Sequence, residues 1–176
     1  MEFKHTFIEG LIEIQPRMFG DERGYFLESY HKKNFAENGI PFDFVQDNQS
    51  SSTAGVLRGL HFQTEPYAQG KLVRVITGKA LDVAVDLRPG SPTFGKHQKF
   101  LLDASLQNMV YIPAGFAHGF LCLEACLFTY KCTNFYNKAS EGGIIWNDPD
   151  LGIDWGVENP NISQKDLDLP QLKDIF

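Results

Sequence analysis

The stretch that decides the fold is LDVAVDLR at residues 81–88, where apolar side chains alternate with polar or small ones. Successive side chains of a strand point to opposite faces of a sheet, so a period of two is the pattern of a half-buried strand. The turn signal RPGSP at residues 88–92 ends the segment. We therefore predict a β-strand with one apolar face over residues 80–87.

Similar short segments recur along the chain between turns rich in Gly and Pro. The predicted strands cover residues 56–63, 72–77, 80–87, 99–102, 109–112, 120–123 and 127–135. Helix signals are few: one candidate at residues 31–38, closed by Gly39, and short turns within 163–175. Many short strands and few helices exclude a parallel βαβ sheet. We predict an all-β fold, an antiparallel jelly-roll barrel with a few short helices.

Length and composition set the general class. The 176 residues suit one domain spanning 1–176, and the 13% of aromatic residues favours sheet. The net charge of −6 disfavours a nucleic-acid surface, although a small anionic ligand remains compatible with it. Apolar runs are too short for a membrane span, and the N-terminus lacks a signal-peptide layout. The cysteines, Cys122, Cys126 and Cys132, are interpreted as reduced thiols packed in strands, which favours a cytoplasmic location.

Polar residues inside the predicted strands are the candidates for chemistry, because burying them costs free energy unless they are paired or used. They are Arg58, His61, Lys71, His118 and Tyr130. Each has a structural explanation when taken singly: a hydrogen-bonded histidine, a solvated lysine or a core aromatic. Taken together, titratable groups that several barrel strands direct inward indicate a reaction pocket.

A metal site is the main competing interpretation of this pocket, because jelly-roll barrels of the cupin type often hold a metal. Such sites need a pair of His on one strand, a carboxylate nearby and another His on a later strand. Position 63, two residues after His61, is Gln, and His118 alone does not complete a site. The sequence also contains no phosphate-binding loop or dinucleotide motif, and GFAHG at 115–119 carries no hydrolase nucleophile. We therefore expect no metal and no other cofactor.

Longer motifs add a resemblance to a known family. They are DERGYF at 21–26, LRGLHFQ at 57–63, QGK at 69–71, DVAVDLR at 82–88, SPTFG at 91–95, IPAGFAHGF at 112–120 and WNDP at 146–149. In this order and over nearly the whole chain, the sequence resembles the dTDP-4-dehydrorhamnose 3,5-epimerase family.

The resemblance implies a metal-independent enzyme with a cupin-type antiparallel jelly-roll barrel, usually a homodimer, in dTDP-L-rhamnose biosynthesis. The implied substrate is dTDP-4-dehydro-6-deoxy-D-glucose, in which carbons 3 and 5 flank a ketone. A base removes a proton from one of these carbons and leaves an enolate, and reprotonation from the opposite face inverts the centre. Such chemistry needs a base, a group that stabilises the enolate oxygen and an acid across the ring.

By the same resemblance, His61 is the base, Asp166 orients its imidazole, Lys71 lies near the developing oxyanion and Tyr130 is the proton donor. Arg23 and Arg58 are expected to clamp the diphosphate, because guanidinium groups suit phosphate oxygens. Further positions that match substrate-contacting residues of the family are Glu28, Gln46, Asn48, His118, Glu141 and Lys165, with Tyr136 as a pocket aromatic. In the family, the N-terminal segment that carries Arg23 and Glu28 can reach a neighbouring subunit's site. For Glu28 and Glu141, a solvated surface carboxylate is the alternative interpretation.

Three alternatives stay open. A relative that inverts only one centre would share nearly all of these residues, although the presence of both Tyr130 and Asp166 favours the double epimerase. A non-catalytic module that binds sugar nucleotides and a metal-dependent cupin are the candidates from other classes.

Overall fold

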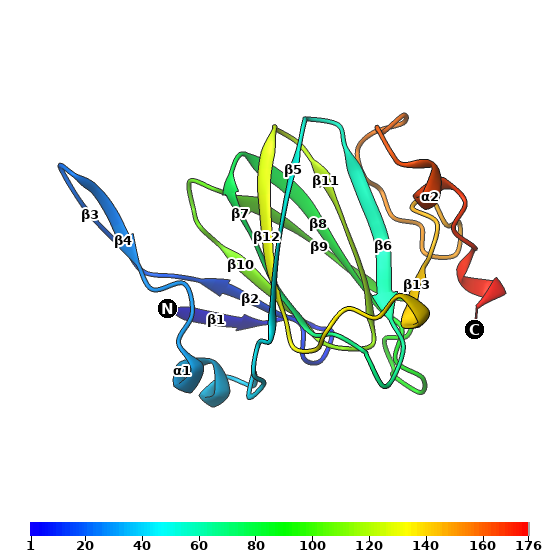
Figure 1. Cartoon of the computed structure of the whole chain (residues 1–176), viewed down its shortest axis with the longest axis horizontal. Helices are drawn as coiled ribbons and strands as arrows, with labels where there is room; N and C mark the ends of the chain where they lie inside the picture. The colour runs from blue at the N-terminus through cyan, green and yellow to red at the C-terminus, as the bar shows by residue number, and fades with distance from the viewer. Residues whose placement is uncertain (176) are drawn as a thin grey trace.

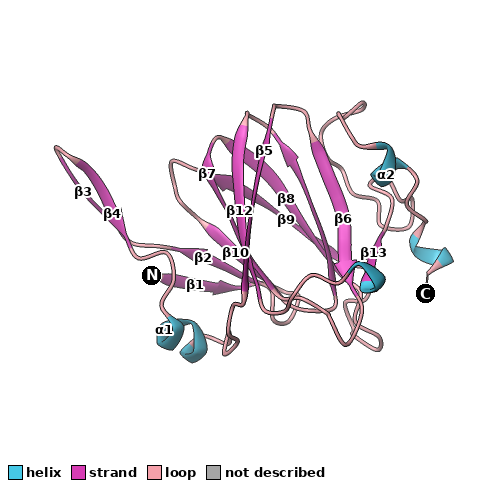
Figure 2. Ribbon diagram, in the orientation of Figure 1, coloured by secondary structure: helices cyan, strands magenta, loops and turns pink. Residues whose placement is uncertain are grey.

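The strands form two antiparallel sheets and a separate hairpin in the computed structural model, which describes residues 1–175 (Figures 1 and 2). The six-stranded sheet has the order β1 (Glu2–His5), β2 (Ile12–Gln15), β10 (Met109–Ile112), β7 (Lys71–Thr77), β12 (Cys126–Cys132) and β5 (Gln46–Ser52). The five-stranded sheet has the order β13 (Glu141–Gly143), β6 (Leu57–Gln63), β11 (Phe116–Cys122), β8 (Lys79–Asp86) and β9 (His97–Asp103). The hairpin pairs β3 (Met18–Asp21) with β4 (Gly24–Leu27). The fold is the predicted jelly roll, since its two sheets enclose a shared core.

The core between the sheets draws side chains from both. Val73 and Val75 of β7 and Phe128 of β12 meet Ala84 of β8 and Phe120 of β11 in one buried cluster. On the outer face of β8, Val83 and Val85 belong to a second cluster that the C-terminal segment covers. The prediction of a half-buried strand was therefore wrong for β8. Asp82 and Asp86 are fully buried, because the strand has a covered layer on each side.

The seven predicted strands correspond to β6 through β12, with differences at their ends. β11 begins at Phe116 rather than at residue 120, and β12 ends at Cys132 rather than at residue 135. The polar strand β5 was missed because its sequence, QDNQSSS, has no apolar alternation. Its seven residues pair in register with all of β12, so backbone hydrogen bonds hold it in place.

The first helix and the C-terminal helices lie where the sequence indicated, whereas a 3-10 turn near residue 139 was not predicted. His31 caps α1 (Lys32–Glu37), and Gly39 follows it with a φ of 90°. The C-terminal part contains α2 (Gln164–Leu167) and a 3-10 turn (Leu172–Asp174), and a further 3-10 turn covers Lys138–Ser140. None of the helices in residues 1–175 is long and apolar enough to cross a membrane. The three cysteines are free and buried.

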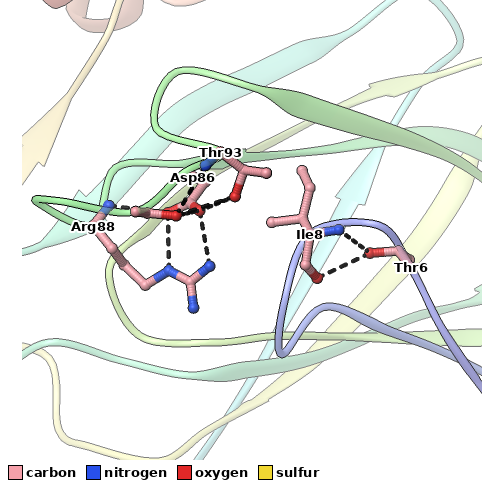
Figure 3. Close-up of polar contacts among 6 residues, drawn as sticks. Thr6, Ile8, Asp86, Arg88 and Thr93 are labelled. Atoms are coloured by element: carbon pink, nitrogen blue, oxygen red, sulfur yellow. Dashed lines mark hydrogen bonds and ion pairs between the residues drawn. The ribbon is translucent and has the colours of Figure 1, made fainter.

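The end of β8 is held by a buried carboxylate (Figure 3). Arg88 donates to Asp86 through Nε and a terminal nitrogen at 2.9 and 2.8 Å, and Ser91 and Thr93 donate hydroxyl hydrogen bonds at 2.6 and 2.7 Å. Burial would raise the pKa of Asp86, but these hydrogen bonds outweigh it and hold the pKa far below its ordinary value. The motif DLRPGSPT thus fixes the turn that leads from β8 to β9.

The β3–β4 hairpin extends away from the two sheets (Figure 1). Met18, Phe19, Tyr25 and Phe26 are 40 to 69% exposed on it, although large apolar side chains normally pack against something. We call this segment, residues 18–27, the arm.

Candidate active site

A cavity of about 400 Å³ opens between the two sheets. Its lining comes from β5, β6, β7, β11, β12 and the segment around α2. Among the candidate residues, it contains Asn48, Arg58, His61, Lys71, His118, Tyr130, Lys165 and Asp166. A neighbouring cavity of about 260 Å³ shares Asn48, His61, Lys71 and Tyr130 and adds Gln46, Tyr136 and Glu141. Eleven of the thirteen sequence candidates therefore lie around two adjoining cavities.

His61 and Asp166 form the first hydrogen-bonded pair of the site. His61 Nε2 lies 2.7 Å from Asp166 Oδ1, and the other carboxylate oxygen accepts the Gly59 backbone N–H at 3.3 Å. The Ser163 side chain caps α2 by accepting the backbone N–H of Asp166, and this contact fixes the position of Asp166 in the first turn of the helix. Burial would raise the pKa of Asp166, but the hydrogen bond and charge of His61 outweigh it and lower the pKa. The carboxylate is therefore ionised at neutral pH and orients the imidazole.

Gly59 allows β6 and β11 to approach closely beside this pair. It has a φ of 111°, and a Cβ at this position would lie 2.6 Å from Gly119 Cα and from His118 O. Only glycine adopts this conformation readily and leaves room for the facing backbone. The pairing register shifts at this point, and His61 lies directly opposite His118.

Lys71 and Tyr130 lie on neighbouring strands, β7 and β12, with Lys71 Nζ 6.0 Å from the ring centroid of Tyr130. Burial lowers the pKa of Lys71, and this effect outweighs those of Cys132, Asp82 and Glu141, which act to raise it. Burial also raises the pKa of Tyr130, with a contribution from Cys132 that Arg58 opposes. The phenol is thus protonated at neutral pH and can donate a proton.

His118, which lines the same cavity, belongs to a second and more buried His–Asp pair. His118 Nε2 is 2.6 Å from Asp82 Oδ2, and their side chains are 7% and 0% exposed. The sequence pattern did not identify Asp82, because the alternation of residues 81–88 assigned it to a polar, solvent-facing side. A charged residue that pairs with a pocket histidine from the adjacent strand is visible only once the register of β8 and β11 is known.

Polar contacts connect the remaining candidates around the rim. Glu141 accepts hydrogen bonds from Lys165 Nζ at 2.8 Å and from the Tyr136 hydroxyl at 3.2 Å. The hydrogen bond from Lys165 is the main cause that lowers the pKa of Glu141. Gln46 Nε2 donates to Asn48 Oδ1 at 3.1 Å. On the other side of the cavity, Arg58 Nε donates to Ser52 Oγ at 3.1 Å.

Two candidates lie apart from the cavities. Arg23 is on the arm, where its guanidinium binds Asp21. Glu28 is exposed just after β4 and lines neither of the two cavities. The expected diphosphate clamp of Arg23 with Arg58 is therefore not assembled within one chain.

The donor set for a metal is also informative. Within residues 1–175, no group of three or more His, Cys, Asp or Glu side chains is arranged to hold a metal ion. Gln63, where a second histidine ligand would be wanted, donates to the Tyr67 and Phe135 carbonyls at 2.7 and 3.2 Å and accepts the Asn137 N–H at 2.7 Å. This side chain fixes two loops beside the cavity.

Together, these contacts provide three chemical capabilities around one cavity. A histidine with an anionic partner can take up a proton, a cation can stabilise an oxyanion, and a protonated phenol can return a proton. Proton transfer at a carbon next to a carbonyl needs this combination.

Comparison with known proteins identifies relatives of the chain. The family model described as dTDP-4-dehydrorhamnose 3,5-epimerase matches residues 5–174. A dTDP-4-dehydrorhamnose 3,5-epimerase of Shigella flexneri is 52% identical over 164 residues, which cover 92% of this chain and 91% of the relative. A solved structure of a dTDP-6-deoxy-D-glucose-3,5-epimerase from Legionella pneumophila, in complex with dTDP-4-keto-L-rhamnose, is 47% identical with a TM-score of 0.95 and covers 99% and 94% of the two chains. A 3'-monoepimerase from Streptomyces bikiniensis, in complex with dTDP-quinovose, is 35% identical with a TM-score of 0.89 and covers 96% and 86%.

Proposed function

Because this chain belongs to the dTDP-4-dehydrorhamnose 3,5-epimerase family, we propose that it inverts carbons 3 and 5 of dTDP-4-dehydro-6-deoxy-D-glucose in dTDP-L-rhamnose biosynthesis. The observation that carries the proposal is the convergence of His61, Lys71 and Tyr130 on one cavity, with Asp166 bound to the histidine. The Legionella relative, whose complex contains dTDP-4-keto-L-rhamnose, supports this substrate class.

Each step of the reaction uses a group in the cavity. The ketone acidifies the hydrogens at carbons 3 and 5, and His61 removes one of them while Asp166 stabilises the resulting imidazolium. Lys71 stabilises the enolate oxygen, where a cation is effective because the site is shielded from water. Tyr130 then delivers a proton to the opposite face of the carbon. No metal is needed in this scheme, since Lys71 stabilises the negative charge on the enolate oxygen.

Substrate binding is assigned to the rim. Arg58 is expected to bind the diphosphate, and His118, Gln46 and Asn48 to contact the sugar or nucleotide. Glu141 and Lys165 form an ion pair beside Tyr136, whose exposed ring offers a surface for the thymine base.

We assign Arg23 and Glu28 to the site of a partner in a homodimer. The arm exposes four large apolar side chains, which a second copy of the chain would cover. The arginine next to them would then reach the partner's diphosphate and complete the clamp. The proposal also includes a single domain over residues 1–176 and a cytoplasmic location.

The second candidate is a single-centre epimerase. The similarity to the Streptomyces 3'-monoepimerase is the observation that favours it. The number of inverted centres depends on how the sugar ring sits between His61 and Tyr130. The double epimerase is favoured because the chain shares more identity with the double epimerases named above.

Solvent exchange separates the candidates. The protein is incubated with the 4-keto sugar nucleotide in deuterated water, and carbons 3 and 5 are followed by NMR. Label at both carbons is the expected result, and label at one carbon identifies the single-centre enzyme. Binding without label would indicate a non-catalytic module. Stoichiometric iron or zinc required for activity would contradict the metal-free scheme.

A further inference from the structure

Asp82 lies at an unusual place for a carboxylate. It is in the middle of β8, paired with Phe120 of β11 and Phe100 of β9, and it is 0% exposed. Ala80 and Ala84, two residues away on either side, belong to the apolar cluster between the sheets. Burying an ionised group in such surroundings is costly unless its charge is compensated. The position therefore calls for a specific role.

Only one of the two carboxylate oxygens of Asp82 has a hydrogen-bond partner within residues 1–175. Oδ2 accepts from His118 Nε2 at 2.6 Å, whereas Oδ1 is buried and has no hydrogen-bond partner within residues 1–175. A purely structural aspartate in this protein is bound differently. Asp86, equally buried, receives hydrogen bonds from Arg88, Ser91 and Thr93.

The contact with Asp82 fixes the ring of His118. The imidazole lies 6.3 and 6.0 Å from the centroids of Phe120 and Phe128, which stack on each other at 3.9 Å. Because Nε2 binds Asp82, Nδ1 is the ring nitrogen that remains for the substrate. The ring is therefore held by a carboxylate and two aromatic neighbours while it lines the cavity opposite His61.

Asp82 is also one of three acidic groups that raise the pKa of Lys71, against the larger lowering effect of burial. The titratable groups around Lys71 come from every neighbouring element: His61 on β6, Asp82 on β8, His118 on β11, Tyr130 and Cys132 on β12, and Glu141 on β13. Asp82, Cys132 and Glu141 are the groups that oppose the effect of burial on the pKa of Lys71.

Two of these three groups are poor counter-charges. Glu141 is already paired with Lys165 at 2.8 Å. Burial raises the pKa of the Cys132 thiol, so it carries little charge at neutral pH. Asp82 is the remaining carboxylate, and its Oδ1 is free of hydrogen bonds within the described residues.

We propose that Asp82 is a positioning residue for this reaction: it orients His118 through one oxygen and supplies the buried negative charge that keeps Lys71 protonated beside the enolate oxygen. The inference rests on the proposed function, since it assigns the same cavity a further residue. Asp82 does not touch the substrate and acts through His118 and Lys71.

The test is Asp82→Asn, which keeps the shape of the side chain and removes its charge. We expect kcat to fall about 10- to 100-fold, by analogy with the loss of a carboxylate that orients a metal-binding imidazole, while KM stays within about twofold. Lys71 then loses its proton at lower pH, so the alkaline limb of the kcat–pH profile moves to lower pH. A merely structural role would not move this limb.

Asp148→Asn is the matched control, because Asp148 is also buried but lies outside the cavity, where it accepts the backbone N–H groups of Asp150, Leu151 and Leu172. We expect this variant to lower thermal stability and to leave the alkaline limb in place. An Asp82→Asn enzyme with the wild-type kcat and alkaline limb would overturn the proposal. So would a loss of activity that only follows the folded fraction, as in the control.

A measurement on the wild type covers the case in which Asp82→Asn does not fold. The nitrogen shifts of the His118 ring, assigned with His118→Gln, report which nitrogen carries the proton. A proton on Nε2 and none on Nδ1 supports the proposal, and an unprotonated Nε2 contradicts it. Absence of solvent exchange in the wild type would instead overturn the proposed function, and the ring measurement would still decide whether Asp82 binds His118.

Discussion

The two His–Asp pairs of the cavity have the same chemistry and different burial. His61 and Asp166, which we call the rim pair, have side chains that are 32% and 6% exposed. His118 and Asp82, which we call the floor pair, have side chains that are 7% and 0% exposed. The rim carboxylate comes from a short C-terminal helix and also accepts a backbone N–H. The floor carboxylate comes from a central strand and keeps one oxygen unpaired within residues 1–175. The difference indicates two separate roles. The accessible pair transfers protons, and the buried pair orients His118 and supplies negative charge beside Lys71.

The largest effect should follow removal of the rim base. His61→Ala is expected to lower turnover at least about 10³-fold, since general base catalysis contributes up to about 10⁴-fold. A coupled assay with a downstream ketoreductase measures the product. Affinity for dTDP, measured by calorimetry, should stay close to that of the wild type, and a variant that retained a tenth of the wild-type turnover would contradict the role.

Asp166→Asn should have the next largest effect, a loss of about 10²- to 10³-fold in kcat, within the range that general acid–base catalysis contributes, because an amide orients the imidazole less well and does not stabilise its charged form. The pH dependence of stability provides a second measurement. The pKa of Asp166 is lowered in the folded protein, so its contribution to stability is present above the unfolded pKa, about 4, and is lost as pH falls through the folded value. Denaturation by urea at several pH values should therefore show a smaller loss on acidification in Asp166→Asn than in the wild type. Equal losses would mean that the pair adds no stability.

Tyr130→Phe tests the acid that both pairs face across the cavity. We expect kcat to fall about 10²-fold, the lower end of what one general acid or base contributes. The base is intact in this variant, so some solvent exchange should persist while net inversion falls further. Quantifying label and inverted product in one NMR time course measures both, and equal losses of the two would contradict the role of Tyr130 as the acid.

The smallest effect is expected at the rim ion pair. Glu141→Gln removes the partner of Lys165, and exposed ion pairs contribute only about 0.2–1 kcal/mol. KM should therefore rise only a few-fold, with kcat nearly unchanged, in initial-rate assays. A large fall in kcat would place Glu141 in the reaction itself. It would also weaken the assignment of proton transfer to the rim pair.

The sequence predicted the parts of this fold that are written in local patterns. Segments such as those of β7 and β10 are apolar between turn residues, and they became core strands. β5 has no such pattern, because its position depends on pairing with β12, which is about 80 residues away in the chain. Local patterns do not report partners of this kind.

The same reasoning applies to the site. His61 could be singled out from its own strand, whereas its contact with Asp166 spans 105 residues and was accessible only through the family resemblance. Asp82 was assigned to the wrong environment, because a period of two does not tell whether the second face of a strand meets solvent or another layer. Charges in the interior therefore became visible only with the tertiary structure.

The division between the two pairs is tested most directly by solvent exchange in two variants, His61→Ala and His118→Gln, at saturating substrate in deuterated water. We predict no label at carbons 3 and 5 with His61→Ala, and slower label at both carbons with His118→Gln. Label with His61→Ala at a rate comparable to that with His118→Gln would contradict the account, because the rim pair would then not be the one that moves the proton.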